Sequence, residues 1–159
     1  MLIKLICVGK LKEDYYEAAC AEFIKRLSRF CTIQICEVAD EKASPCVSAA
    51  LEMQIKDKEG ARIIGQVGDR DYLIALDLNG KQYSSTAFAD KLRGLFEKGR
   101  GDLAFVIGGS TGLSPAVTAR ADECLKLSEM TFPHRIARLI LLEQLYRAFK
   151  IWHGEPYHK

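Results

Sequence analysis

The pattern of apolar and polar residues along the chain switches repeatedly between two periods. Five short segments are apolar almost throughout or alternate with polar residues, which is typical of β-strands, and the most continuous of them are expected to be covered on both faces of a sheet. The predicted strands are residues 2–8, 32–38, 72–77, 103–107 and 124–128. A polar loop from Asp40 to Pro45 and a turn at Asn79-Gly80 are predicted from their residue types.

Between the strands, apolar residues recur every three or four positions, which is the spacing of a helix with one buried face. Long helices are predicted over residues 16–30, 47–67 and 134–151. Ser84 or Ser85 is a suitable N-cap for another helix, and Ser114 followed by Pro115 marks the start of a short one. This alternation predicts an α/β fold with a mainly parallel sheet, in a single domain over residues 1–159.

The last predicted helix carries apolar side chains around its whole circumference. They are Ile136, Leu139, Ile140, Leu141, Leu142, Leu145, Tyr146 and Phe149. A helix that is apolar on every side must be buried on every side. One face is expected to pack on the sheet and the other on a second copy of the chain, so we expect a homodimer. The alternative is that one chain covers the whole helix by itself.

The composition is that of an ordinary soluble globular protein, with 48% hydrophobic and 28% charged residues. Lys and Arg number 23 against 21 Asp and Glu, far from the excess of a segment that coats RNA by charge alone. Any RNA partner must therefore be met by a local patch or by shape. No apolar run is long enough to span a membrane, and the apolar N-terminus lacks the preceding basic region of a signal peptide. We expect a cytoplasmic protein.

The cysteines have none of the spacings that indicate a metal site or a redox pair. They are Cys7, Cys20, Cys31, Cys36, Cys46 and Cys124. None forms a C-x-x-C pair, and none stands at zinc-finger spacing with a histidine. We expect small buried side chains in a reducing compartment, with no disulfide and no bound metal.

A glycine-rich segment from Gly108 to Gly112 follows the predicted strand 103–107, and its backbone N–H groups can approach a ligand closely. A P-loop is excluded because Leu113 stands where the lysine of that motif belongs, and the G-x-G-x-x-G pattern of dinucleotide sites is absent. Ligands of parallel α/β sheets bind at the carboxyl ends of the strands. The ends of strands 72–77 and 103–107 and the segment after strand 124–128 are therefore expected to form one site, shaped for an adenosine.

The same segment also matches G-x-S-x-G, the motif of a hydrolase nucleophile, with Ser110 at its centre. Asp122 or Glu123 and then His134 follow in hydrolase order. However, the helix predicted to begin at Ser114 starts too late for the sharp turn that this motif requires, and no oxyanion loop is present. A serine hydrolase is therefore less favoured than a cofactor site and is kept as the alternative.

Five segments together resemble the RlmH family of SPOUT methyltransferases, along the whole chain. They are residues 8–12 (VGKLK), 105–113 (FVIGGSTGL), 127–134 (LSEMTFPH), 143–150 (EQLYRAFK) and 157–159 (YHK). The resemblance implies a SPOUT fold, an α/β sheet with a C-terminal trefoil knot, in a homodimer. It implies S-adenosylmethionine (SAM) as cofactor and, as substrate, a pseudouridine in helix 69 of 23S rRNA, methylated at N3 on the assembled ribosome.

By motif, the family's cofactor contacts fall on the three strand ends singled out above. They are Leu76, Gly108, Leu127, Ser128, Glu129, Met130, Thr131 and Phe132. Methyl transfer also requires a held base and removal of the N3 proton. His134 and Arg138 beside the cofactor segment, and Tyr157 and His158 in the tail, are the candidates, the tail reaching the partner subunit. A ribosome-binding factor without catalysis is the other alternative.

Overall fold

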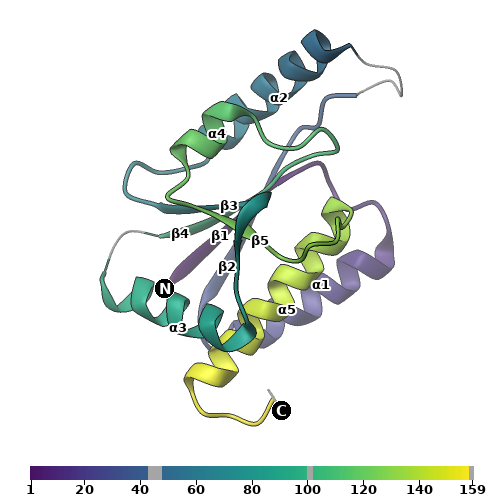
Figure 1. The fold of residues 1–159 in the computed structure, drawn as a ribbon. Helices are drawn as coiled ribbons and strands as arrows, with labels where there is room; N and C mark the ends of the chain where they lie inside the picture. The colour runs from purple at the N-terminus through teal and green to yellow at the C-terminus, as the bar shows by residue number, and fades with distance from the viewer. Residues whose placement is uncertain (43–47, 100–101, 158–159) are drawn as a thin grey trace.

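The computed structural model describes residues 1–42, 48–99 and 102–157, in which strands and helices alternate (Figure 1). The strands are β1 (Leu2–Val8), β2 (Thr32–Val38), β3 (Tyr72–Gln82), β4 (Leu103–Ile107) and β5 (Glu123–Lys126). The helices are α1 (Asp14–Leu27), α2 (Ala49–Ile64), α3 (Ser85–Glu97), α4 (Pro115–Arg120) and α5 (His134–Trp152). The predicted alternation is confirmed, and each predicted strand lies on an observed one.

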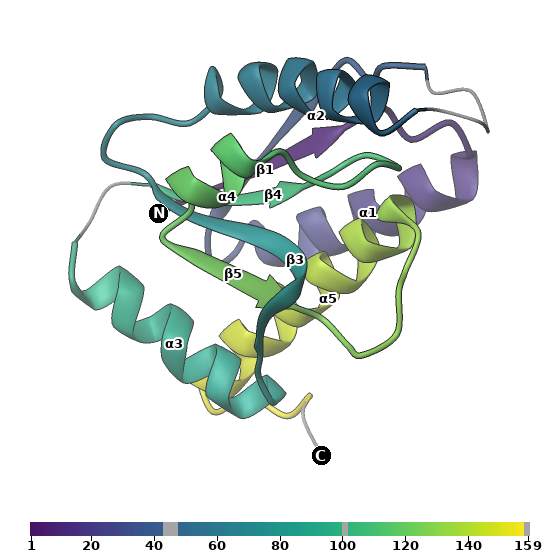
Figure 2. The same ribbon diagram turned by 45° about the horizontal axis from the view of Figure 1, so that its top comes forward.

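The strands form one sheet in the order β2-β1-β4-β3-β5, and every pair in it is parallel. Helices α2 and α4 cover one face, and α1, α3 and α5 cover the other (Figure 2). The predicted α/β class with a parallel sheet is therefore confirmed. Because the strands all run the same way, their carboxyl ends share one edge of the sheet, where ligands of such sheets bind.

Alternate residues of the central strands are buried in two separate cores. On β1, Ile3 and Leu5 belong to the larger core under α1, α3 and α5, whereas Ile6 and Val8 belong to the smaller core under α2 and α4. This follows from the period of two in a strand, which sends successive side chains to opposite faces. A strand covered on both faces is apolar almost throughout, and in β1 only Lys4, near the amino end, departs from this.

The turn predicted at Asn79-Gly80 is wrong, because β3 continues through these residues to Gln82. The pairing with β5 jumps from Leu76 to Lys81, both opposite Leu125, so the residues between them form a bulge. A Cβ at position 80 would lie 2.6 Å from the backbone carbonyl of Cys124. The glycine is therefore required by the close approach of two strands rather than by a chain reversal.

The helix boundaries agree with the predicted caps. The Ser84 hydroxyl accepts a hydrogen bond from the Ala87 N–H. Ser114, which directly precedes Pro115, accepts one from the Val117 N–H with its hydroxyl. Helix α1 ends at Leu27, earlier than the predicted residue 30. The second helix begins at Ala49. The second half of the predicted loop before it, residues 43–45, lies outside the described residues together with Cys46 and Val47.

Helix α5 packs on the sheet between α1 and α3, which together cover much of its circumference (Figure 1). Its residues Leu141, Leu142 and Leu145 are fully buried, while Leu139 and Ile140 stay partly exposed. The chain itself thus covers more of this helix than its apolar pattern implied. A second subunit for the remaining face stays a prediction.

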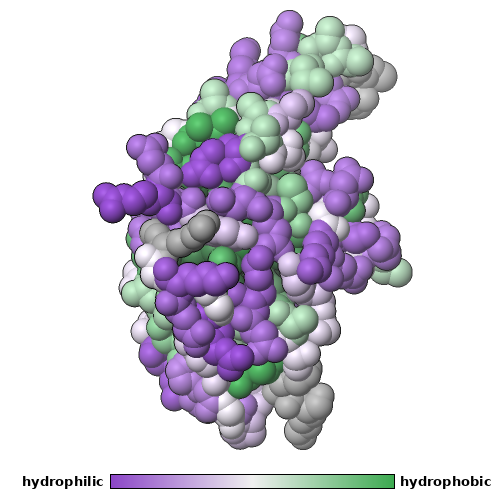
Figure 3. Space-filling model, turned by 60° about the vertical axis from the view of Figure 1, so that its left-hand side comes forward, coloured by the Kyte–Doolittle hydropathy of each residue, from purple (hydrophilic) through white to green (hydrophobic). Residues whose placement is uncertain are grey.

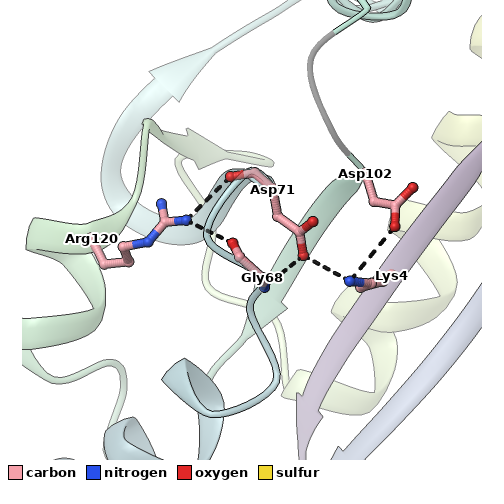
Figure 4. A network of polar contacts seen from close by, with 5 residues as sticks. All are labelled: Lys4, Gly68, Asp71, Asp102 and Arg120. Atoms are coloured by element: carbon pink, nitrogen blue, oxygen red, sulfur yellow. Dashed lines mark hydrogen bonds and ion pairs between the residues drawn. The ribbon is translucent and has the colours of Figure 1, made fainter.

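Polar contacts tie together the amino ends of the strands, at the edge opposite the carboxyl ends (Figure 4). Lys4 Nζ lies 2.8 Å from Asp71 Oδ2 and 3.7 Å from Asp102 Oδ2, and Arg120 donates to the carbonyls of Gly68 and Asp71. Burial disfavours the charge of Asp71, but the hydrogen bonds from Lys4 and the Gly68 N–H outweigh it and lower the pKa of this carboxyl. Hydrophilic residues cover much of this face (Figure 3).

The described cysteines are free thiols. Cys7, Cys20 and Cys31 are buried, as expected, whereas Cys36 and Cys124 are only partly buried. Burial raises the pKa of Cys7 and of Cys31 to about 12, so neither thiol is ionised near neutral pH. In the described parts of the chain, no helix combines the length and the apolar character needed to cross a membrane.

Candidate cofactor site

A cavity of about 970 Å³ opens at the carboxyl edge of the sheet, where β3, β4 and β5 end. This volume is at the upper end of the range for small-molecule sites. The predicted cofactor and catalytic residues that line it are Leu76, Gly108, Leu127, Ser128, Met130, Thr131, Phe132 and His134. The structure therefore brings together three segments that lie up to 58 residues apart in the sequence, from Leu76 to His134.

The first wall comes from the bulged part of β3. Leu76 is the last residue before the bulge, and Asp77, Leu78 and Asn79 continue the wall. The Asn79 N–H donates to Asp77 Oδ1 at 2.7 Å, which fixes the bulged backbone locally. Leu78 is 55% exposed, so this wall presents an apolar side chain at the cavity mouth.

The second wall is the glycine loop after β4. Gly109 and Gly112 form an isolated antiparallel bridge, with the Gly112 N–H donating to the Gly109 carbonyl at 3.2 Å. Gly112 has a φ of 86°, which glycine adopts without strain. The hydroxyl oxygen of Thr111, which lines the cavity, is buried and has no hydrogen-bond partner among the described residues. The loop thus offers a polar group that a ligand can satisfy.

The third wall is the segment between β5 and α5. Ser128 Oγ accepts the Met130 N–H at 3.0 Å, which turns the chain, and Met130 is 72% exposed at the rim. Glu129 does not line the cavity: its side chain is 81% exposed and forms an ion pair with Lys126. Of the predicted cofactor residues, Glu129 is therefore the one that the structure places outside the cavity.

His134 begins α5 and lies on the cavity wall. Burial lowers the pKa of its imidazole below the ordinary value, and the positive charges of Arg135 and Arg138 lower it further. The negative charges of Asp40 and Glu13 raise the pKa but do not cancel this effect. The ring is therefore neutral near pH 7 and has a nitrogen able to accept a proton.

Arg138 lies one turn along α5 but outside the cavity wall, with its side chain 4% exposed. Its guanidinium donates to Glu37 Oε1 at 2.8 Å and to the Gly9 carbonyl at 3.2 Å. These contacts join α5 to the ends of β1 and β2. Arg138 therefore holds the helix that carries His134.

Replacing Arg138 by methionine is expected to lower the free energy of unfolding by about 2 kcal/mol, because the Glu37 carboxylate and the Gly9 carbonyl lose a buried donor. Urea unfolding measures this change. The matched control is Arg26→Met, since Arg26 pairs with Glu22 on the exposed side of α1 and its loss should cost less than about 0.5 kcal/mol. Equal stability of the two variants would contradict this function of Arg138.

The tail places Tyr157 against α5 and outside the cavity. Its hydroxyl donates to Glu143 Oε1 at 3.2 Å, its ring lies edge-on to Tyr146 with centroids 4.9 Å apart, and Arg147 stacks over it. Glu143 is nine residues from His134, or about 14 Å along the helix. His158 lies outside the described residues.

The serine hydrolase alternative is not favoured by this arrangement. Ser110 and His134 line the same cavity, but α4 begins only at Pro115, so Ser110 does not stand on a strand-to-helix turn. Asp122 lines a cleft at the opposite edge of the sheet, beside Asp71, and Glu123 pairs with Lys91. The acidic member that a triad requires is therefore not brought to Ser110.

Several residues of the cavity are not predicted from the sequence. Lys56 from α2 lines it, although its pattern indicates only a charged helix face. Leu78 and Asn79 also line it, although Asn79-Gly80 predicts a turn. Pro133 and Ala137 complete the wall near α5. No local pattern distinguishes these residues from ordinary surface or core positions, because the fold alone brings them to the cavity.

The lining fits an adenosine-type cofactor in size and chemistry. Leu76, Leu127 and Phe132 supply apolar surface, the glycine loop supplies close backbone, and Thr111 supplies an unpartnered hydroxyl. Such a mixture of apolar walls and few polar groups is typical of small-molecule sites. Beside this lining, the neutral imidazole of His134 can accept a proton.

Comparisons with known proteins point in the same direction. Residues 1–158 match the family described as "Predicted SPOUT methyltransferase". The chain is 52% identical to ribosomal RNA large subunit methyltransferase H of Streptococcus thermophilus, 50% to that of Latilactobacillus sakei and 53% to that of Clostridium novyi, each over 100% of both chains.

Solved structures share the fold at much lower sequence identity. A methylase family protein from Haemophilus influenzae superposes with a TM-score of 0.57 at 14% identity, covering 99% of this chain and 70% of its own. A methyltransferase from Legionella pneumophila, solved with bound SAM, gives a TM-score of 0.51 at 12% identity, covering 94% of this chain and 66% of its own.

Proposed function

Because the chain belongs to the SPOUT methyltransferase family, and within it to the ribosomal RNA large subunit methyltransferases H (RlmH), we propose that it transfers a methyl group from SAM to 23S rRNA. The acceptor is N3 of a pseudouridine in helix 69 of the assembled ribosome. The observation that carries this proposal is the cavity of about 970 Å³ where three strand ends meet around a glycine loop.

The cavity residues divide into those that bind the cofactor and those that act on the base. Leu76, Gly108, Leu127, Ser128 and the segment from Met130 to Phe132 would hold SAM, which would supply a methyl group on a positively charged sulfur. Transfer requires the N3 nitrogen in line with that methyl and about 3–3.5 Å from it, without its proton. A metal is not needed in this scheme, because the leaving group is already activated.

His134 is the candidate that accepts the N3 proton, because it lies on the cavity wall and its imidazole is neutral near pH 7. With SAM bound, its methyl group would be the one transferred to the deprotonated N3, and the neutral thioether would be the leaving group. Arg138 supports this histidine by holding the start of α5 against β1 and β2.

The ratio of methylation rates between wild type and His134→Gln should fall at low pH, because an imidazolium cannot accept a proton. Since the pKa of His134 lies below the ordinary value, we expect this ratio to begin to fall at a lower pH than it would for an unperturbed histidine. Single-turnover rates between about pH 5.5 and pH 8.5 measure it. A ratio independent of pH would remove His134 from the proton transfer.

The active form is proposed to be a homodimer in the cytoplasm. Leu78 and Met130 expose apolar side chains at the cavity mouth, and Ile140 on α5 borders a second, smaller cavity. Within one chain, Tyr157 is bound to the side of α5 and does not line the cavity. A tail that acts on RNA would therefore serve the cavity of the partner subunit.

Labelled SAM and intact ribosomes from a strain that lacks this enzyme test the proposal directly. The expected product is one methyl group per ribosome, mapped to a pseudouridine of helix 69. Methylation at another nucleotide would refute the substrate, and SAM binding without any transfer would favour a ribosome-binding factor. Absence of SAM binding would refute the cofactor.

A further inference from the structure

A buried carboxylate lies directly behind the glycine loop and has no part in the scheme above. Glu59, on α2, is 3% exposed. Its Oε1 accepts the backbone N–H of Glu41 at 2.9 Å, so the side chain is fixed from one side. A Cβ on Gly109 would lie 3.0 Å from Oε2 and 3.4 Å from Oε1, so the carboxylate occupies the space beside this glycine of the loop.

The other oxygen of this carboxylate is unsatisfied. Glu59 Oε2 is buried and has no hydrogen-bond partner among the described residues, like the hydroxyl of Thr111 in the same loop. A buried acceptor without a donor costs roughly 1–3 kcal/mol. Glu59 lies beside Gly109 of the loop, and Thr111 belongs to the same loop, so hydrogen bonding is incomplete both in the loop and directly behind it.

We propose that Glu59 is a positioning residue for the glycine loop, and that a donor of the loop binds its free oxygen when the cofactor enters the cavity. The loop carries hydrogen-bond donors in its backbone N–H groups and in the hydroxyl of Thr111. The proposal rests on the cavity being the SAM site. It explains why a carboxylate is kept among apolar side chains such as Val8, whose Cγ1 faces the same point of the loop.

Electrostatics give this contact a measurable signature. Burial raises the pKa of the Glu59 carboxyl; the Glu41 N–H lowers it, the charges of Asp40 and Glu41 raise it, and that of Arg62 lowers it. Arg62 itself is bound to Glu41 and to the Ala39 carbonyl, so it only partly offsets the burial. A donor that arrives with the cofactor favours the ionised form, so binding should release a proton from Glu59.

Calorimetric titration with SAM at about pH 5–7, in buffers of different ionisation enthalpy, measures this proton. We expect wild type to release a fraction of a proton and Glu59→Gln to lose that fraction and bind SAM about tenfold more weakly. Proton exchange that persists in Glu59→Gln belongs to other groups, such as His134. The matched control is Asp57→Asn, which makes the same chemical change on the exposed side of α2 and should leave affinity and proton release unchanged.

Thermal unfolding without cofactor separates positioning from a merely structural function. A carboxyl with a raised pKa binds more protons in the folded chain than in the unfolded one, so wild type loses stability as pH rises through that range. The Glu59→Gln side chain does not titrate, so its Tm relative to wild type should rise by about 2–4 °C from about pH 4 to pH 7. Cofactor affinity and stability of the free protein should thus change in opposite directions.

Glu59→Gln that binds SAM and releases protons like wild type overturns the proposal. The proposal is also overturned if the Tm of Glu59→Gln lies below that of wild type at every pH. Its weaker SAM binding would then follow from a less stable fold. If Glu59→Gln does not fold, Glu59→Asp keeps the charge but withdraws it from the loop, and its affinity should still fall. A wild-type protein that does not bind SAM refutes the cofactor site itself, which is a different outcome.

Discussion

Gly108→Val is expected to weaken SAM binding by about 100-fold, equivalent to about 2.7 kcal/mol. The position is closed on its inner side: a Cβ there would lie 3.0 Å from Leu113 Cδ2 and 3.1 Å from the Gly112 carbonyl carbon. Valine adds two further methyl groups, which must enter the cavity or push the loop away from Leu113. Either movement removes the close backbone that the cofactor requires.

Calorimetry with SAM measures the loss, and thermal unfolding shows whether the chain remains folded. Gly94→Val is the matched control: a Cβ at Gly94 of α3 meets nothing within 4 Å, so its SAM affinity should equal that of wild type. Thr131→Ala, which removes a hydroxyl from the opposite wall, should weaken binding by about fivefold. Unchanged affinity in both Gly108→Val and Thr131→Ala would show that SAM binds elsewhere.

Removal of residues 157–159 is expected to reduce methylation of ribosomes by more than about 100-fold while SAM affinity stays within about twofold. Tyr157, the one residue of this segment that the structure describes, does not line the cavity of its own chain, so we expect cofactor binding to be unchanged. What is lost is a ring and a histidine that the partner subunit would use to hold the base.

Single-turnover methylation and SAM titration of the truncated protein separate the two effects. Tyr157→Phe is a useful companion, because it keeps the ring beside Tyr146 and removes only the hydrogen bond to Glu143. It should retain most of the activity if the ring stacks on a base. Wild-type turnover by the truncated protein would exclude the tail from the mechanism.

The sheet could be predicted from the sequence because strands that are buried on both faces are apolar at nearly every position. Residues 2–8 and 103–107 coincide with β1 and β4, and the caps at Ser84 and Ser114 have local hydrogen-bond signatures. The bulge at Asn79-Gly80 could not be predicted, because its glycine is required by the close approach of the Cys124 backbone on another strand. A contact between segments more than 40 residues apart leaves no local pattern.

The site divides in the same way. The glycine loop and the segment before His134 could be singled out because glycines and a strand end mark them, and the structure brings them to one cavity. Lys56 and Glu59 could not, since on α2 they resemble any charged helix residues. The motif that carried Glu129 into the cofactor set is continuous in sequence, whereas the cavity takes only the residues whose side chains point inward. The knot came with the family resemblance alone and stays a prediction.

The unequal cores on the two faces of the sheet have a consequence for local opening of the chain. Helices α2 and α4 rest on the smaller set of buried side chains, which includes Ile6, Ile63 and Val117, so fewer apolar contacts oppose their detachment. Glu59 belongs to α2, and the glycine loop beside it borders the ligand cavity. A molecule bound in the cavity would therefore suppress fluctuations of the most easily released part of the fold, and its affinity would include the entropy lost there.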